Sequence, residues 1–254
     1  MSAINNINIV NNFKFKDSID ILITGIKEDQ KKPSRLKGIP VELEEEMKSV
    51  LDFEKNLGKD NKKILLYSKE LYMRFCLYGY KTENNSDKIR AMASEIVSYV
   101  NLNKLKNLAI DLKSFGINNE KKLQAFTEGL VLGSYEFLEY KPKSKLSSLK
   151  SITLIGNGSQ KVITKASIIG LGVCYGRDLS NHPANILTPT YIADEAVTIS
   201  KSNKNMSSKV IDVSQFQKLG LGSFYGVAMG ADEPAKLILV EYNGGRKKDK
   251  PIAL

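Results

Sequence analysis

Short apolar runs alternate with longer amphipathic stretches along the first 140 residues, and this alternation predicts an α/β fold. Runs of aliphatic and β-branched residues bounded by Asn, Gly, Lys or Asp are typical of strands, and they occupy Ile7–Val10, Asp20–Thr24, Lys63–Ser68 and Asn107–Ile110. Between them, helical spacing covers Val41–Phe53, Lys69–Tyr80 and Ser86–Val100, with Ser86 as a helix cap. Strands that alternate with helices indicate layers around a mainly parallel sheet.

The longest helical pattern spans Asn119–Tyr140 and has one largely apolar face. Gly129 and Gly133 lie one turn apart in this pattern, and a residue without a side chain lets a neighbouring backbone come close. Because the segment is amphipathic, this glycine spacing favours core packing over a contact between membrane helices. The apolar face consists of Leu123, Phe126, Leu130 and Tyr135 or Phe137.

A charged stretch that contains a proline, Lys141–Lys145, predicts an exposed connection and a domain boundary. We therefore expect one domain at 1–145, a linker with the connecting strand Ile152–Ile155 at 146–164, and the start of a second domain at 165–254.

The second half continues the alternation of helices and strands. An apolar helix is predicted at Lys165–Leu179, and Thr188 caps a helix that has Pro189 in its first turn and reaches Ser200. A short helix is expected at Ser214–Leu219. The patterns predict strands at Lys209–Val213, Phe224–Met229 and Lys236–Tyr242, and the beginning of a buried strand at Pro251–Leu254.

The net charge of +10 raises the question of a nucleic acid partner, because clustered Lys and Arg neutralise phosphates. The excess is divided between the halves, +6 in residues 1–150 and +4 in residues 151–254, and no basic tail is present. Lys outnumbers Arg by 33 to 5, which favours the codon bias of an AT-rich genome as the explanation. A basic patch that acts in an assembly stays open as an alternative.

The sequence predicts a cytoplasmic protein with reduced thiols. The most apolar stretch, Ala166–Gly176, is too short for a membrane helix and is broken by glycine. The segment Met1–Val10 lacks the basic and apolar regions of a signal peptide. Cys76 and Cys174 lie far apart in apolar surroundings, which favours buried free thiols over a disulfide or a metal cluster.

The residues that could carry chemistry form no pattern of a catalytic or metal site. His182 is the only histidine, so neither an imidazole metal cluster nor a serine triad is supported, and a turn role is expected. The glycine pairs at 170/172, 220/222 and 244/245 belong to no phosphate-binding motif. Four carboxylates lie on separate predicted elements without ligand spacing and are expected to be solvated or capping groups: Asp178, Asp194, Asp212 and Asp232.

Five motifs in order give the chain a resemblance to a known family. The stretch from Arg177-Asp178-Leu179 to Pro189 resembles the "RDL-x-N-x-P-x-N-x-x-x-P" signature of the leucyl aminopeptidases, the cytosol aminopeptidase family. Upstream, Glu128–Lys141 resembles the family's "EG-x-x-L-x-x-Y-x-F-x-x-Y-K" helix. Downstream, similar segments of the family match Leu219–Gly230, Leu237–Gly245 and Pro251–Leu254.

The resemblance implies a macro-like amino-terminal α/β domain followed by an α/β catalytic domain. Family members bind two divalent metal ions, commonly zinc, manganese or magnesium, which activate a water that cleaves the first peptide bond. They form homo-hexamers, and some bind DNA. These are expectations for this chain, as are peptide substrates and a cytoplasmic location.

The family's metal ligands and catalytic groups lie in a "GKG-x-x-F-D-x-GG" loop and a "DAEGR" motif, and neither occurs in this sequence. No catalytic, cofactor-binding or metal-binding residue is therefore assigned to any position. We expect an aminopeptidase chain that stops before the metal site and is inactive alone. Two alternatives stay open: a non-catalytic module that binds nucleic acid or caps an assembly, and a damaged gene whose product does not fold stably.

Overall fold

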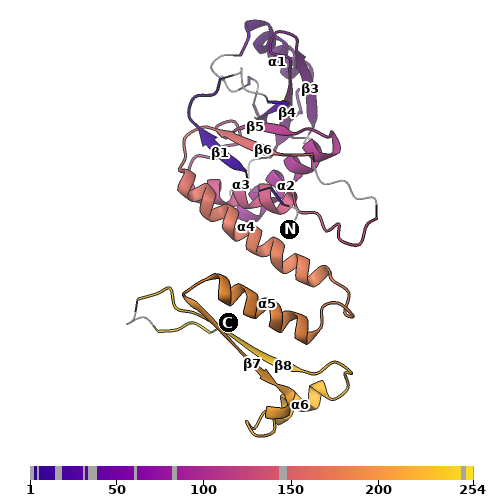
Figure 1. The fold of residues 1–254 in the computed structure, drawn as a ribbon. Helices are drawn as coiled ribbons and strands as arrows, with labels where there is room; N and C mark the ends of the chain where they lie inside the picture. The colour runs from indigo at the N-terminus through magenta and orange to yellow at the C-terminus, as the bar shows by residue number, and fades with distance from the viewer. Residues whose placement is uncertain are drawn as a thin grey trace. The chain divides into compact units, whose positions relative to one another are not determined.

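The computed structural model describes residues 3–4, 6–14, 19–30, 32–33, 39–59, 62–81, 85–142, 148–246 and 250–253. The chain forms two compact units, Met1–Asp178 (unit 1) and Leu179–Leu254 (unit 2), whose elements are drawn in Figure 1. Each unit is described by itself.

Unit 1 is built on a six-stranded sheet, in which every neighbouring pair is parallel except β3 and β4. This confirms the predicted mainly parallel sheet. One edge of the sheet joins strands that are distant in sequence, because Ile7 of the first strand pairs with Ile152. The order across the sheet is β1 (Ile7–Val10), β6 (Ser151–Ile155), β5 (Asn107–Asp111), β2 (Ile21–Lys27), β4 (Met73–Tyr80) and β3 (Lys63–Ser68).

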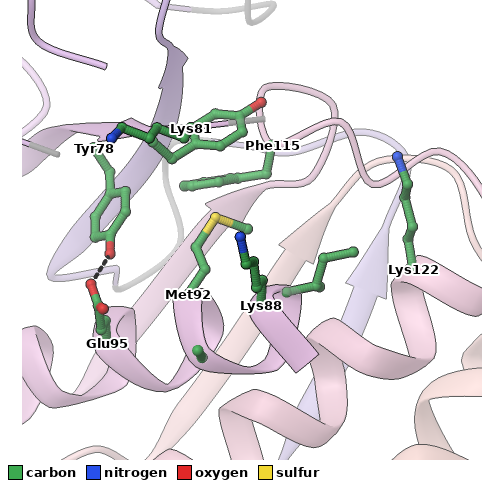
Figure 2. Close-up of a pocket in the computed structure, with 10 residues that line it drawn as sticks. Tyr78, Lys81, Lys88, Met92, Glu95, Phe115 and Lys122 are labelled. Carbon is green, nitrogen blue, oxygen red and sulfur yellow. Dashed lines mark hydrogen bonds between the residues drawn. The ribbon is translucent and has the colours of Figure 1, made fainter. Parts of the chain in front are cut away.

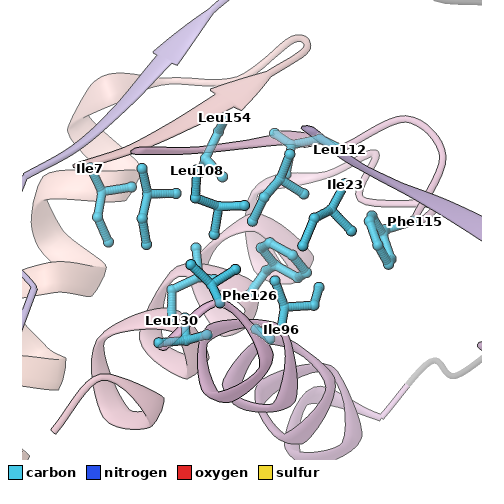
Figure 3. Packing of buried hydrophobic residues seen from close by; sticks show 14 of the residues in the cluster. Ile7, Ile23, Ile96, Leu108, Leu112, Phe115, Phe126, Leu130 and Leu154 are labelled. Atoms are coloured by element: carbon cyan, nitrogen blue, oxygen red, sulfur yellow. The ribbon is translucent and has the colours of Figure 1, made fainter. Parts of the chain in front are cut away.

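Helices cover both faces of this sheet. The alternation along β2 sends Ile21 and Ile23 into one core and Leu22 and Ile26 into the other. The first core, seen in Figure 3, is closed by α2 (Ser86–Leu102), α3 (Glu120–Gly133) and α4 (Gln160–Asn181). The second is closed by α1 (Val41–Phe53), which buries Leu43, Met47 and Leu51.

Helices α2 and α3 pack backbone to backbone at the two glycines, as the sequence predicts. A Cβ at Gly129 would collide with the carbonyl oxygen of Arg90, and one at Gly133 would lie 2.8 Å from Cβ of Ser94. The Ser94 hydroxyl donates a hydrogen bond of 2.8 Å to the carbonyl oxygen of Gly129. The contact therefore depends on the missing side chains.

Unit 2 consists of α5 (Pro189–Ser202) packed on an antiparallel pair, β7 (Met206–Asp212) and β8 (Lys236–Tyr242). A 3₁₀ turn at Val213–Gln215 and helix α6 (Gly222–Ala228) connect the two strands. Several apolar side chains are exposed on β8 and α6, among them Leu239, Val240, Tyr242 and Val227.

The predicted helix at Lys69–Tyr80 is wrong, because residues 73–80 form strand β4. This strand is hydrogen-bonded between β2 and β3 and buried on both faces, so its apolar run lacks the alternation that would have marked a strand. Residues 69–72 form the turn of the β3–β4 hairpin, with Tyr72 at a φ of 49°.

Two predicted strands in unit 2 are also wrong. Phe224–Met229 falls on helix α6 and its C-cap. The helix follows a turn in which the Leu221 N–H donates a hydrogen bond to the carbonyl oxygen of Phe216. The rings of Phe216 and Phe224 pack at 5.0 Å, so the helix is held by its aromatic residue. At Pro251–Leu254, residues 251–253 form no strand and are exposed, and Leu254 lies outside the described residues.

Several element limits differ from the predictions at their ends. Asn85 is the α2 cap instead of Ser86, since its side chain accepts from the Asp87 N–H at 2.7 Å. The pattern at Asn119–Tyr140 forms a helix only to Gly133, and the short helix predicted at Ser214–Leu219 is the 3₁₀ turn named above. Of the predicted exposed connection, Lys141 and Pro142 are exposed, and residues 143–145 lie outside the described residues.

The predicted domain limits, 1–145, 146–164 and 165–254, stay a prediction. The compact unit that holds the sheet extends to Asp178, because β6 is hydrogen-bonded between β1 and β5 and α4 buries Ile163 and Cys174 in the same core. None of the described helices has the length and apolar character that a membrane crossing demands. Cys76 and Cys174 are buried free thiols, as predicted.

The α2–α3 contact generates a first prediction. Gly129→Ala should lower the free energy of unfolding by about 2 kcal/mol, because overpacking outweighs the gain of about 1 kcal/mol in helix propensity. Gly172→Ala is the matched control in α4, where a Cβ meets nothing within 4 Å, and it should stabilise by up to about 1 kcal/mol. Urea denaturation of both variants measures the difference, and equal stabilisation would contradict the close contact.

A second prediction concerns two buried hydroxyls of unit 1. Within the described part of the chain, the Thr127 hydroxyl is buried without a hydrogen-bond partner, whereas the Ser134 hydroxyl accepts from the Ile4 N–H and donates to the Val131 carbonyl, both at 2.8 Å. Thr127→Val should therefore raise the free energy of unfolding by about 1 kcal/mol, and Ser134→Ala should lower it by about 1–3 kcal/mol. Thermal denaturation measures both, and a destabilised Thr127→Val variant would count against the assignment.

Candidate functional site

The signature motif covers the end of α4, a turn at residues 182–188 and the start of α5. The turn belongs to unit 2 and is held by its own backbone, since the Pro183 carbonyl accepts from the N–H groups of Ile186 and Leu187, both at 2.9 Å. The Thr188 hydroxyl caps α5 by accepting from the Tyr191 N–H at 3.2 Å, with Pro189 in the first turn, as predicted. The ring of His182 lies 5.8 Å from that of Tyr191. The sole histidine thus lies in a turn against an aromatic ring.

The arginine of the signature has a packing role in unit 1. Arg177 donates from Nη1 to the carbonyl oxygen of Leu132 at 3.2 Å, and its guanidinium lies 5.7 Å from the ring centre of Tyr135. Tyr135 belongs to the upstream motif that follows Glu128. Two motifs more than 40 residues apart in sequence therefore contact each other at the junction of α3 and α4.

The glutamate of the upstream motif is also engaged structurally. Glu128 is buried on α3 and accepts from Nε of Arg90 at 2.7 Å and from Gln124 at 2.8 Å. The hydrogen bond to Glu128 and the negative charge of Glu128 raise the pKa of Arg90 above its ordinary value. A buried carboxylate with these two partners ties α3 to α2 and is poorly placed to act as a metal ligand.

The four candidate carboxylates are not brought together into one cluster. Asp212 pairs with Lys236 across β7 and β8 at 2.6 Å, and Asp194 and Asp232 are exposed. Over the ranges that the structure describes, no three His, Cys, Asp or Glu side chains are grouped so that they could hold a metal ion. The described residues therefore do not fit a two-metal centre.

The two thiols are also unsuited to nucleophilic chemistry. Burial raises the pKa of Cys76 to about 12. Burial also raises the pKa of Cys174, and the positive charge of Arg177 offsets this only in part. The raised pKa values keep both groups mainly as thiols at neutral pH, whereas the thiolate is the nucleophilic form.

Unit 1 contains a cavity between β4, α2 and the loop after β5, which the sequence analysis did not predict (Figure 2). Its volume is about 190 Å³. Because the sequence pattern placed residues 69–80 in a helix, Tyr78, Tyr80 and Lys81 were not expected at a strand end. The lining residues are separate in sequence, from Tyr78 to Lys122, and come together only in the folded chain.

Comparison with known proteins identifies the family. The model for the N-terminal domain of the cytosol aminopeptidase family matches residues 23–144, and the model for its catalytic domain matches residues 174–254. A mutant of tomato leucine aminopeptidase has a similar fold, with a TM-score of 0.83 and 24% identity over 98% of this chain and 53% of that one. The bottromycin maturation enzyme BotP has a TM-score of 0.67 at 18% identity, over 87% of this chain and 45% of that one.

Curated relatives match in the same way. A probable cytosol aminopeptidase of Pseudomonas fluorescens strain SBW25 is 38% identical over 145 residues, which are 55% of this chain and 29% of the relative. One from Alkaliphilus oremlandii is 29% identical over 251 residues, which are 92% of this chain and 50% of the relative. The chain thus spans half or less of the length of these relatives. With models of both family domains matched in order, the chain belongs to the cytosol aminopeptidase family.

Proposed function

We propose that the chain is part of a metal-dependent aminopeptidase that releases amino-terminal residues such as leucine from peptides. The observation that carries this proposal is the match of both family domain models in sequence order, 23–144 and then 174–254. The contact between Arg177 and Tyr135 supports it, because two motifs of the family resemblance come together in one packed junction. The mixed sheet of unit 1 supports a macro-like amino-terminal domain.

The metal chemistry of the family would be supplied by residues outside these 254. In such an enzyme, a bound pair of divalent ions would supply Lewis-acid chemistry for the attacking water and the peptide carbonyl. Manganese is one candidate, since BotP has been solved in complex with Mn. The "GKG-x-x-F-D-x-GG" and "DAEGR" motifs do not occur in the printed sequence. This chain would then contribute the frame: Arg177 and Glu128 hold the helices, and Thr188 starts α5. A cytoplasmic location and hexamer formation belong to the same proposal.

The corresponding prediction is that the purified 254 residues do not hydrolyse leucine p-nitroanilide with Mn²⁺ or Zn²⁺ present. The assay follows release of nitroaniline, and the full-length Pseudomonas fluorescens relative serves as the positive control. Circular dichroism of the same sample establishes that the chain is folded. Turnover that requires metal, is abolished by EDTA and elutes with the chain would show that the 254 residues are active alone. It would contradict the proposal that other residues supply the metal site.

A second experiment tests the link to the family chemistry directly. The nucleotide sequence downstream of the Leu254 codon is translated in all three frames and searched for the Gly-Lys-Gly and Phe-Asp-x-Gly-Gly segments. If they are present, co-expression of both parts should yield metal-dependent leucine p-nitroanilide hydrolysis. If they are absent, or if the co-expressed parts associate and remain inactive, the peptidase proposal fails.

A further inference from the structure

Strand β1 lies at one end of the six-stranded sheet, so only one of its two edges has a neighbouring strand. Its inner edge pairs with β6, where the carbonyl oxygen of Asn6 accepts from the Ile152 N–H at 3.0 Å. Successive residues of a strand direct their backbone groups to opposite sides in such a ladder. The N–H and carbonyl groups of Ile7 and Ile9 therefore face the outer edge of the sheet.

The side chain of Gln160 occupies this outer edge. Its Nε2 donates to the carbonyl oxygen of Ile7 at 3.1 Å, and its Oε1 accepts from the N–H of Ile9 at 3.1 Å. One residue of an additional parallel strand would make the same two bonds, because its N–H and carbonyl groups reach residues i−1 and i+1 of the neighbouring strand. The amide of Gln160 therefore takes the place of one residue of a seventh strand.

Rigid elements place Gln160 at this edge. It is the first residue of α4, so the helix fixes its backbone. The preceding turn lies directly against β1, since a Cβ at Gly158 would come within 2.7 Å of Cδ1 of Ile9. The segment before β1 is held as well, because the Ser134 hydroxyl accepts from the Ile4 N–H at 2.8 Å. The amide therefore meets a strand whose position is already fixed.

The sequence around β1 supplies no charge that could protect its edge. From Met1 to Phe13 the chain contains no Lys, Arg, Asp or Glu. Short uncharged segments with high β-propensity tend to pair with other chains when they lie at an open edge. The opposite edge of the sheet differs, because β3 begins with the exposed Lys63 and follows the exposed Lys62. Lysine on an edge strand is a common protection against association, and β1 lacks it.

We propose that Gln160 is an edge cap that prevents β1 from pairing with β1 of a second copy of this chain. In a two-fold pairing the strands run antiparallel, and Ile7 of one copy bonds to Ile9 of the other. This pairing needs the two backbone groups that Gln160 occupies. It also puts Asn8 opposite Asn8 of the second copy, so no like charges oppose it. The cap lies within unit 1 and does not depend on the proposed peptidase function.

Sedimentation velocity of the full 254-residue chain tests the proposal. Gln160→Leu keeps the approximate size of the side chain and removes both hydrogen bonds, so it should form a species of twice the wild-type mass as its concentration rises. Gln160→Ala should do the same. Gln217→Leu is the matched control, because it adds the same apolar side chain at an exposed position and should sediment like the wild type. If both Gln160 variants are folded by circular dichroism and sediment like the wild type, the proposal is wrong.

A charge placed on β1 should reverse the association. Gln160→Leu combined with Asn8→Lys should sediment like the wild type, because two lysines would lie directly opposite each other in the paired strands. Gln160→Leu combined with Gln217→Lys adds the same charge at a distant position and should remain associated. Equal behaviour of the two double variants would place the contact outside β1 and contradict the proposal.

Amide hydrogen exchange of the wild-type chain tests the cap without a substitution. The Ile9 N–H faces outward, yet it should be protected like the Asn8 N–H, which faces β6. In dilute Gln160→Leu the Ile9 N–H should exchange at least about fivefold faster, and the Asn8 N–H should keep its rate. An unprotected Ile9 N–H in the wild-type chain would show that the cap does not form, and it would overturn the proposal.

Discussion

Burial of a mainly parallel sheet on both faces is the constraint on which unit 1 depends. Parallel strands need crossover helices, and those helices fall on opposite faces, so each central strand must be apolar on both sides. Strand β2 meets this requirement with Ile21 and Ile23 toward α2 and α3, and Leu22 and Ile26 toward α1. The same requirement brings the carboxyl end of β4 beside α2, where the cavity forms.

The family motifs in this chain are tied to packing. Gly129 admits the α2 backbone, the buried Glu128 pairs with the partly exposed Arg90, and Arg177 contacts the ring of Tyr135. Removing Arg90 would leave the buried carboxylate of Glu128 without its ion-pair partner, which costs more than the pair itself contributes. The roles of these residues are therefore explained by packing alone. Their presence indicates family membership and does not indicate catalytic activity.

The sequence predicts elements well where polar residues mark their ends. Strand β3 at Lys63–Ser68 and β8 at Lys236–Tyr242 have the predicted limits, because charged or small polar residues bound both. Strand β4 was misassigned because tertiary burial on both faces removed its alternation, and α6 because its short run of small and aromatic residues has no cap. The cavity could not be predicted, since its lining spans residues 78–122 and exists only once β4 lies beside α2.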